Sequence, residues 1–310
     1  MRLLIRFQLE RAASLPLDHQ EHLSGLVYRL LGESDSDYAA FLHDEGYRLE
    51  EQGNRRYKLF VFSTLRVPKS RRRVEGSLLR VAPGEVTWLL ASPREDFLTH
   101  SATGLFSIGQ AVQVGHIPLT IAGIECLPEP VFRSPMRFTC LTPIVASVPR
   151  EDRSTRYLVP ADGPEFSEAV RRNLLRKYEL VHRAPPGTEP PSGSESPAGH
   201  QSPTAPQPAL VAQPPRGLQS PSGPQSLSSP QSWGNRAAPV DDRLELVFDP
   251  GYLSRSPHGG TKLTTFKGIQ IRGALAPFTL TGSEELMRVA WNCGLGEKNS
   301  SGFGMVEEAQ

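Results

Sequence analysis

His43 is a residue whose type and position suit proton transfer. It stands in the segment FLHDEG, residues 41–46. Histidine titrates near neutral pH, so its ring can give or take a proton. We expect a short helix over residues 36–45 that stops at Gly46, which puts His43 in the last helical turn. The helix C-terminus and the adjacent acidic pair, Asp44 and Glu45, would both favour the imidazolium, the form that suits a general acid. The alternative is a surface histidine that caps this helix.

A glycine-rich loop near the end of the chain could hold phosphate groups. Residues 294–304 have the sequence GLGEKNSSGFG, in which five residues separate two Gly-hydrophobic-Gly pairs. Glycine lets the backbone approach a ligand and adopt positive φ, and the polar side chains between the pairs can bond phosphate or sugar oxygens. The loop follows an expected helix and precedes an expected strand, the reverse of a dinucleotide fingerprint, and it lacks a Walker Gly-Lys-Ser/Thr. A flexible turn is the alternative, but the spacing is specific.

The elements that must position these residues alternate as strand, helix, strand, strand, helix, strand in the first half of the chain. A helix over residues 21–31 carries a buried leucine and valine stripe. Tyr28 lies roughly 130° from the centre of that stripe, on one shoulder, and His22 lies on the other. Residues 57–65 form an aromatic and β-branched run that suits a central strand. The other expected elements of this half are strands 2–10, 73–81 and 86–91, a helix 94–107, and strands from residue 111 to residue 125.

The second half repeats this plan around an insertion. Residues 184–240 contain 14 prolines among 57 residues and only four charged side chains. Such a segment cannot bury enough apolar surface to offset its ordering entropy, so we expect it to be disordered. Ser283 can cap a helix that runs to Cys293, with Glu284 and Glu285 complementing its dipole. The other expected elements are strands 137–142, 244–248, 263–271, 274–280 and 302–307, and a helix 166–182.

Two βαββαβ units in tandem predict an α+β fold of two ferredoxin-like domains, residues 1–130 and 131–310. The second domain would carry the disordered Pro/Ser-rich insertion and the glycine-rich loop.

Composition and charge set further bounds. The formal net charge is +1, so the chain is not basic throughout, and what matters for nucleic acid is the distribution of charge. Cys126, Cys140 and Cys293 lack CxxC spacing, which argues against a disulfide framework or structural zinc and favours the cytoplasm. No segment is apolar and long enough to span a membrane, and residues 1–10 do not resemble a signal peptide. The basic clusters lie at residues 69–73, 171–177 and 262–272, and each is ordinarily a solvated face.

Four segments together resemble one known family. They are LSGLVY (residues 23–28), FLHDEGY (41–47), KLFVFS (58–63) and the glycine-rich loop. The loop spacing on a tandem ferredoxin-like chain is similar to the repeat-associated RNA-binding proteins of CRISPR systems. The other segments point to the CRISPR-associated endoribonucleases of Cas family six, which cut precursor CRISPR RNA within its repeats. The long insertion departs from the family but interrupts none of these segments.

The resemblance implies metal-independent cleavage by attack of a ribose 2′-OH on the adjacent phosphate, which leaves a 2′,3′-cyclic phosphate and a 5′-OH. Such chemistry needs a base, an acid and a group that stabilises the phosphorane. The resemblance makes His43 the leading catalytic residue. Tyr28 would orient or deprotonate the 2′-OH, or stack a base, with His22 a weaker alternative. Lys58 would stabilise the phosphorane, although Arg55 and Arg56 stand close enough to serve instead.

The expected partner is CRISPR repeat RNA, and no cofactor or metal is expected, because no ligand spacing is present. Contacts with the RNA are expected from the loop residues Gly294, Gly296, Lys298, Asn299, Ser300, Ser301, Gly302 and Gly304. A basic hairpin tip at residues 256–262 is a further candidate contact, with a plain hairpin as the alternative. Two other functions stay open: a non-catalytic RNA-binding subunit of a CRISPR effector complex, and a general RNA-binding module. Homodimer formation also stays open.

Overall fold

The computed structural model describes residues 1–49, 55–152, 154–183 and 240–309. The expected disordered insertion therefore lies outside the described residues, apart from its last residue. That residue, Val240, is half-buried against the hydrophobic core. Among the described residues, no helix is both long enough and apolar enough to cross a membrane.

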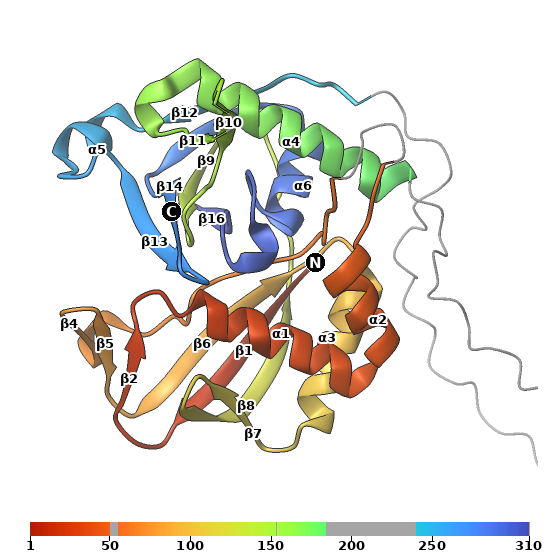
Figure 1. Cartoon of the computed structure of the whole chain (residues 1–310), viewed down its shortest axis with the longest axis vertical. Coiled ribbons are helices and arrows are strands. Elements are labelled where there is room, and N and C mark those ends of the chain that lie inside the picture. The colour runs from red at the N-terminus through yellow and green to blue at the C-terminus, as the bar shows by residue number, and fades with distance from the viewer. Residues whose placement is uncertain (50–54, 153, 184–239, 310) are drawn as a thin grey trace, which may run out of the picture.

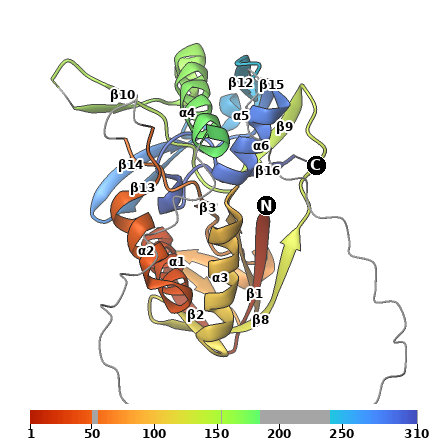
Figure 2. The same ribbon diagram turned by 90° about the vertical axis from the view of Figure 1, so that its right-hand side faces the viewer.

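The first half of the chain forms an antiparallel sheet with the strand order β3-β6-β1-β8-β7. Helices cover one face of this sheet, as Figure 2 shows for α1 and α3. The order β3-β6-β1-β8, with a helix after β1 and another after β6, is that of a ferredoxin-like βαββαβ unit. The strands are β1 (Arg2–Leu9), β3 (Val61–Phe62), β6 (Gly84–Ala91), β7 (Ala111–Val114) and β8 (Ile117–Leu127). The helices are α1 (Gln20–Ser34), α2 (Ser36–Ala40), a π-helical turn (Phe41–Glu45) and α3 (Glu95–Ser107).

The second half repeats the same order in a second sheet, β12-β15-β9-β16. Here α4 follows β9 in the chain and α6 follows β15, so the α+β class and the repeated ferredoxin-like plan are confirmed. In Figure 1 this sheet occupies the upper half of the molecule and the first sheet the lower half. The elements are β9 (Met136–Cys140), α4 (Gly163–Arg183), β12 (Leu244–Phe248), β15 (Phe278–Gly282), α6 (Glu284–Cys293) and β16 (Val306–Glu308).

Smaller elements decorate the two sheets. A three-stranded sheet has the order β2-β5-β4, and two hairpins, β10–β11 and β13–β14, extend from the second half. The strands are β2 (Ala13–Pro16), β4 (Arg72–Glu75), β5 (Leu78–Val81), β10 (Ser147–Pro149), β11 (Thr155–Tyr157), β13 (Thr261–Phe266) and β14 (Ile269–Ala274). The short helices are α5 (Pro250–Arg255) and the 3-10 turns Lys69–Arg71, Pro160–Asp162 and Asn299–Ser301.

Local sequence explains why the helices lie where they do. The leucine and valine stripe of α1 is fully buried, and α1 packs closely on α3 because Gly104 has no side chain. A Cβ atom at Gly104 would lie 1.9 Å from the carbonyl oxygen of Leu30. At the other end of the chain, the Ser283 Oγ accepts a hydrogen bond from the Leu286 N–H at 3.2 Å, which confirms the predicted cap of α6.

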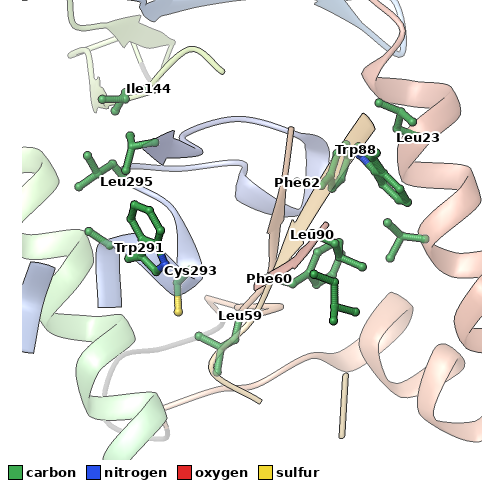
Figure 3. Packing of buried hydrophobic residues seen from close by; sticks show 14 of the residues in the cluster. Leu23, Leu59, Phe60, Phe62, Trp88, Leu90, Ile144, Trp291, Cys293 and Leu295 are labelled. Carbon is green, nitrogen blue, oxygen red and sulfur yellow. The ribbon is translucent and has the colours of Figure 1, made fainter. Parts of the chain in front are cut away.

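One hydrophobic core joins the two halves. Figure 3 shows Trp291, Cys293 and Leu295 from the second half in the same cluster as Phe60 and Phe62 from the first. The buried guanidinium of Arg2 adds a polar link, since its Nη2 donates to the Trp291 carbonyl at 2.7 Å. The two halves therefore cannot separate without exposing apolar side chains.

Several expected strands differ from those observed, and the differences lie at turns. Residues 57–65 do not form a central strand: only Val61–Phe62 is a strand, and it lies at the sheet edge. Residues 73–81 are a hairpin that turns at Gly76, and residues 263–271 are a hairpin that turns at Lys267 and Gly268. The φ angles of these three residues are positive, at 59°, 49° and 76°, and they reverse the chain direction. The sequence pattern alone predicted one continuous strand at each place.

Candidate active site

The three expected catalytic residues, Tyr28, His43 and Lys58, lie together. The Lys58 Nζ donates to the Tyr28 Oη at 2.6 Å and to the His43 backbone carbonyl at 3.1 Å. The imidazole of His43 meets the Tyr28 ring edge-on, with 5.2 Å between the ring centroids. Residues far apart in the sequence thus form one cluster, which we call the catalytic trio after the roles that the sequence predicts for them.

Tyr28 sits at the edge of the core rather than in it. Its ring packs edge-on against Phe60, with 6.3 Å between centroids, while its hydroxyl faces Lys58. The position of Tyr28 on α1 accounts for this half-buried location, because the residue lies on the shoulder of the buried leucine and valine stripe. His22, on the other shoulder, lies instead against Gly115 in the turn between β7 and β8. His22 is therefore not part of the trio.

His43 is placed by a tight local fold. The π-helical turn Phe41–Glu45 ends at Gly46, whose φ is 62° and whose N–H donates to the Phe41 carbonyl at 2.8 Å. A Cβ atom on Gly46 would lie 2.9 Å from the Tyr57 carbonyl oxygen, so only glycine lets the segment around Tyr57 approach this closely. The two segments are joined there by a backbone bridge between Tyr47 and Tyr57. The bridge brings Lys58 beside His43, and π-turns of this kind are frequent at functional sites.

The His43 imidazole is exposed and oriented. Its side chain is 61% exposed, and its Nδ1 lies 2.7 Å from the Asp44 Oδ1. When the Nδ1–H donates to this carboxylate, the Nε2 is the nitrogen that can exchange a proton with a bound molecule. The acidic neighbour Asp44 therefore orients the ring.

Burial shifts the proton affinity of the other two members of the trio. It raises the pKa of Tyr28 well above its ordinary range, and the negative charge of Asp44 adds to this. Burial lowers the pKa of Lys58, against the opposing charge of Asp44, and the positive charges of Lys267 and Arg56 add to the lowering. The phenol therefore stays protonated at neutral pH, which favours a hydrogen-bonding role for Tyr28 over a role as base.

Arg55 and Arg56 were the alternatives to Lys58. Both side chains are exposed, and Arg56 donates to the Asp44 carbonyl oxygen through its Nη1. Neither has the contact with Tyr28 that Lys58 has. The geometry therefore favours Lys58 as the cation nearest the Tyr28 hydroxyl.

The glycines of the loop are needed by the fold itself. Gly294, Gly296, Gly302 and Gly304 are all buried and all have positive φ. A Cβ atom would lie 2.1 Å from the Val145 carbonyl oxygen at Gly296, and 2.0 Å from the Leu295 carbonyl oxygen at Gly304. The close backbone approach that the sequence predicted is thus, in this structure, an approach to other parts of the same chain.

Asn299 also faces inward, which differs from the expected contact of its side chain with a ligand. Its Nδ2 donates to the carbonyls of Leu295 (3.0 Å) and Phe303 (2.9 Å). Its Oδ1 accepts from the Nζ of Lys177 at 2.6 Å. The exposed part of the loop is Lys298, with Ser300 and Ser301 half-buried beside it.

Lys177 is a residue whose role the sequence analysis missed. Its basic cluster, residues 171–177, is ordinarily a solvated face, but Lys177 is only 3% exposed. Its Nζ donates to the carbonyls of Gly294 and Gly296, both at 2.8 Å, and to Asn299. A signal was present: Lys177 follows the inward-facing Val170 by seven residues, which places it on the buried side of α4.

Two segments of the second half touch α1 along the face that carries Tyr28. Residues Glu21, Ser24 and Tyr28 share this face, because they are three and four positions apart. The Ser24 Oγ donates to the Ser300 carbonyl in the glycine-rich loop at 3.4 Å. The Glu21 Oε2 accepts from the backbone N–H of Lys267, at the tip of the β13–β14 hairpin, at 3.2 Å. The exposed side chains of Lys298 and Lys267 therefore belong to segments that contact the helix bearing Tyr28.

The chain matches two family models and two curated relatives over nearly its whole length. The family model "CRISPR-associated protein Cas6, N-terminal" matches residues 14–125, and "CRISPR associated protein Cas6, C-terminal" matches residues 127–203 and 242–308. The chain is 25% identical over 311 residues to a CRISPR-associated endoribonuclease Cas6 of Pyrococcus furiosus, covering 99% of this chain and 89% of the relative. It is 21% identical over 306 residues to CRISPR-associated endoribonuclease Cas6 1 of Methanocaldococcus jannaschii, covering 99% and 92%.

Solved structures share the fold. A Cas6-related protein of Pyrococcus furiosus superposes with a TM-score of 0.69 at 16% identity, covering all of this chain and 98% of that one. A structure described as a RAMP protein that binds different RNA substrates superposes with a TM-score of 0.67 at 18% identity, with full coverage of both chains. The two family models together cover most of the chain, including all three residues of the catalytic trio. The chain belongs to the Cas6 family of CRISPR-associated proteins.

Proposed function

We propose that this protein is an endoribonuclease that cuts precursor CRISPR RNA within its repeats to release guide RNAs. The observation that supports this most directly is the catalytic trio, in which Lys58 contacts both the Tyr28 hydroxyl and the His43 backbone. The two curated relatives carry the name of this activity over nearly the whole length of the chain. Nothing in the proposed reaction requires a metal ion, because the trio supplies proton transfer and positive charge.

In the proposed reaction, the 2′-oxygen of a ribose forms a bond to the adjacent phosphorus and the bond from phosphorus to the 5′-oxygen breaks. We assign the general acid role to His43, whose Nε2–H would protonate the departing 5′-oxygen. The Lys58 ammonium would stabilise the charge that develops on the phosphorane. Since the pKa of Tyr28 is raised, its hydroxyl would orient the 2′-OH by hydrogen bonding, and the 2′-OH proton would pass to solvent. The products would be a 2′,3′-cyclic phosphate and a 5′-OH.

We propose that the glycine-rich loop holds the RNA through its outer surface. Lys298 is exposed and can pair with a backbone phosphate, and the half-buried Ser300 and Ser301 can donate to oxygens beside it. The buried glycines and Asn299 would then serve to shape this surface. In this proposal, the loop binds and the trio cuts.

The remaining expectations stay predictions. They are the division of the chain at residue 130, a cytoplasmic location, participation in a CRISPR effector complex and a homodimer.

The test is a cleavage assay on repeat RNA in excess EDTA. The expected result is a single cut, with a cyclic phosphate on the upstream product and no cut when a 2′-deoxyribose precedes the scissile phosphate. Cleavage that requires added Mg²⁺, or that tolerates the 2′-deoxyribose, would contradict the proposed reaction. Tight binding of intact RNA without any cleavage would indicate the alternative function, a non-catalytic RNA-binding subunit.

A further inference from the structure

A hollow of about 400 Å³ lies on the small β2-β5-β4 sheet, away from the catalytic trio. Four of its ten lining residues are arginines, Arg71, Arg72, Arg73 and Arg80, and none of the ten is a carboxylate. The other lining residues are small or apolar and come from β2, β5 and the segments beside them. We call this feature the arginine hollow. It contains much of the basic cluster at residues 69–73, which the proposed reaction does not use.

Two of the arginines are built into the wall of the hollow. Arg71 is half-buried and donates to the carbonyls of Pro83 (3.2 Å) and Glu85. Arg80 donates to the Ser14 Oγ and to the Glu75 carboxylate at 3.0 Å. These contacts hold the guanidinium groups in place across three strands, so that the positive charge is positioned before any ligand arrives.

The other two arginines are exposed, as Arg80 also is. The side chain of Arg73 is 82% exposed, and its Nε approaches Glu75 only to 3.7 Å. Arg72 is also exposed, on strand β4, where all four residues face solvent. An exposed ion pair of this length contributes little to stability, so structural stability does not account for Arg73. Glu75 is the acidic residue paired with this group, and four guanidinium groups against one carboxylate leave a net positive charge.

The chemistry that fits this hollow is a phosphate group. The planar guanidinium of arginine matches phosphate with paired hydrogen bonds and stays charged at all physiological pH values. Because the hollow opens on an exposed strand, it suits the backbone of a long polyanion better than a small molecule that must be enclosed.

The position of the hollow relates it to the trio. Strand β2 leads directly into α1, and Figure 1 shows β2, β4 and β5 together at one side of the lower half, with α1 running from that side towards α2. From Gln20, where α1 begins, to Tyr28 is about 12 Å at 1.5 Å per residue. The tip of the β13–β14 hairpin, with exposed Lys267, contacts α1 between these two points, at Glu21. One exposed lysine, Lys267, therefore belongs to a segment that contacts α1 between Tyr28 and strand β2.

We propose that the arginine hollow is a second phosphate-binding site for the RNA substrate, which holds the backbone several nucleotides away from the scissile bond. This inference rests on the proposed function in one respect, that the ligand is RNA. It assigns to the chain a contact that the cleavage chemistry does not require. An RNA long enough to reach the hollow gains affinity from it, and an RNA confined to the cleavage site does not.

The test uses the full chain and the double variant Arg72→Ala/Arg73→Ala, because these side chains are exposed and their loss leaves the wall of the hollow intact. The matched control is Arg133→Ala/Arg137→Ala, two exposed arginines of the second half. Affinity is measured for repeat RNAs shortened stepwise from each end, with a 2′-deoxyribose at the cleavage position to prevent cutting. Thermal unfolding of each variant verifies that the fold is unchanged.

The double variant is expected to bind full-length repeat RNA at least tenfold more weakly, with the slope of log K against log salt reduced by about 1.5 for two lost contacts. RNA trimmed to the cleavage site binds the variant and the wild type equally, and the cleavage rate at saturating RNA is unchanged. Equal affinity of variant and wild type for long RNA would overturn the proposal, as would an equal loss on long and short RNA. Displacement of long RNA by micromolar ATP or inorganic phosphate would identify a small-anion site instead and would also overturn it. Absence of cleavage by the wild type would count against the proposed function alone, because the binding comparison does not depend on cutting.

Discussion

The Lys58 ammonium donates a 2.6 Å hydrogen bond to the Tyr28 hydroxyl, and the same ammonium donates to the backbone carbonyl of His43. Lys58 thus ties together residues of α1 and of the π-helical turn. Its position beside two polar groups of the trio explains why a half-buried lysine is tolerated there.

Replacement of Lys58 by alanine is expected to lower the cleavage rate at saturating RNA by about 10²–10³-fold, because a positive group aimed at the developing charge is lost. Single-turnover cleavage at neutral pH measures this. Arg55→Ala and Arg56→Ala are the matched controls, and each is expected to retain a rate within a few-fold of the wild type. A larger loss in either arginine variant than in Lys58→Ala would transfer the role to that arginine.

Replacement of Tyr28 by phenylalanine is expected to lower the cleavage rate about tenfold, the effect of one lost hydrogen bond to a reacting group. Burial raises the pKa of Tyr28, so the phenolate is scarce at neutral pH and orientation is the expected role. The rate of the wild type should therefore not rise tenfold per pH unit from pH 6 to 9, as a phenolate base would require. A rate that rises tenfold per pH unit throughout, and that loses this slope in Tyr28→Phe, would show that Tyr28 acts as the base.

Lys177→Met is expected to destabilise the protein, because it leaves the carbonyls of Gly294 and Gly296 and the Asn299 Oδ1 without their donor. Each buried acceptor without a partner costs about 1–3 kcal/mol. Urea unfolding measures the loss, and Arg172→Met, an exposed site on the same helix, is the control.

Stability should also depend on pH through Lys177. Burial lowers the pKa of Lys177 from an ordinary 10.5 to about 8. Between these values the unfolded chain binds the proton and the folded chain does not, so the free energy of unfolding rises with pH. The advantage of the wild type over Lys177→Met should accordingly grow from pH 8 to pH 10.5. A constant difference across that range would show that Lys177 keeps its proton in the fold.

Lys298→Ala is expected to weaken the binding of repeat RNA and to lower the slope of log K against log salt by about 0.7–0.9, the contribution of one phosphate contact. The cleavage rate at saturating RNA should not change. An unchanged affinity together with a slower cleavage rate would instead place Lys298 in the chemistry.

Periodic patterns predicted the parts of the fold that depend on local sequence. The leucine and valine stripe of α1 and the Ser283 cap of α6 are both observed, because they depend on neighbours three or four positions away. The segments LSGLVY, FLHDEGY and KLFVFS pointed to the trio through a resemblance to a family rather than through geometry. That resemblance could name Tyr28, His43 and Lys58, but it gave no reason for them to meet.

The predictions that are wrong concern residues whose structure depends on contacts with distant segments of the chain. Residues 57–65 have the composition of a central strand, but the chain leaves regular strand geometry at Leu59, which has a φ of 52°. Phe62 is buried in part because the glycine-rich loop covers it: a Cβ atom at Gly302 would lie 2.7 Å from its ring. Lys177 belongs to a basic cluster, and such a cluster is ordinarily a solvated face. Burial of its ammonium is costly unless acceptors surround it. Only the three acceptors of the loop, more than a hundred residues away, show what offsets that cost.

We propose that His43 transfers the proton that allows the RNA to be cut. Single-turnover cleavage of repeat RNA in EDTA, with His43→Ala beside His22→Ala, tests it most directly. His22 is an exposed histidine that lies against Gly115 instead of Tyr28, so it controls for the loss of an imidazole as such. We predict that His43→Ala binds RNA normally and cuts about 10²–10⁴-fold more slowly, while His22→Ala cuts at the wild-type rate. Cleavage by His43→Ala at the wild-type rate would contradict the claim.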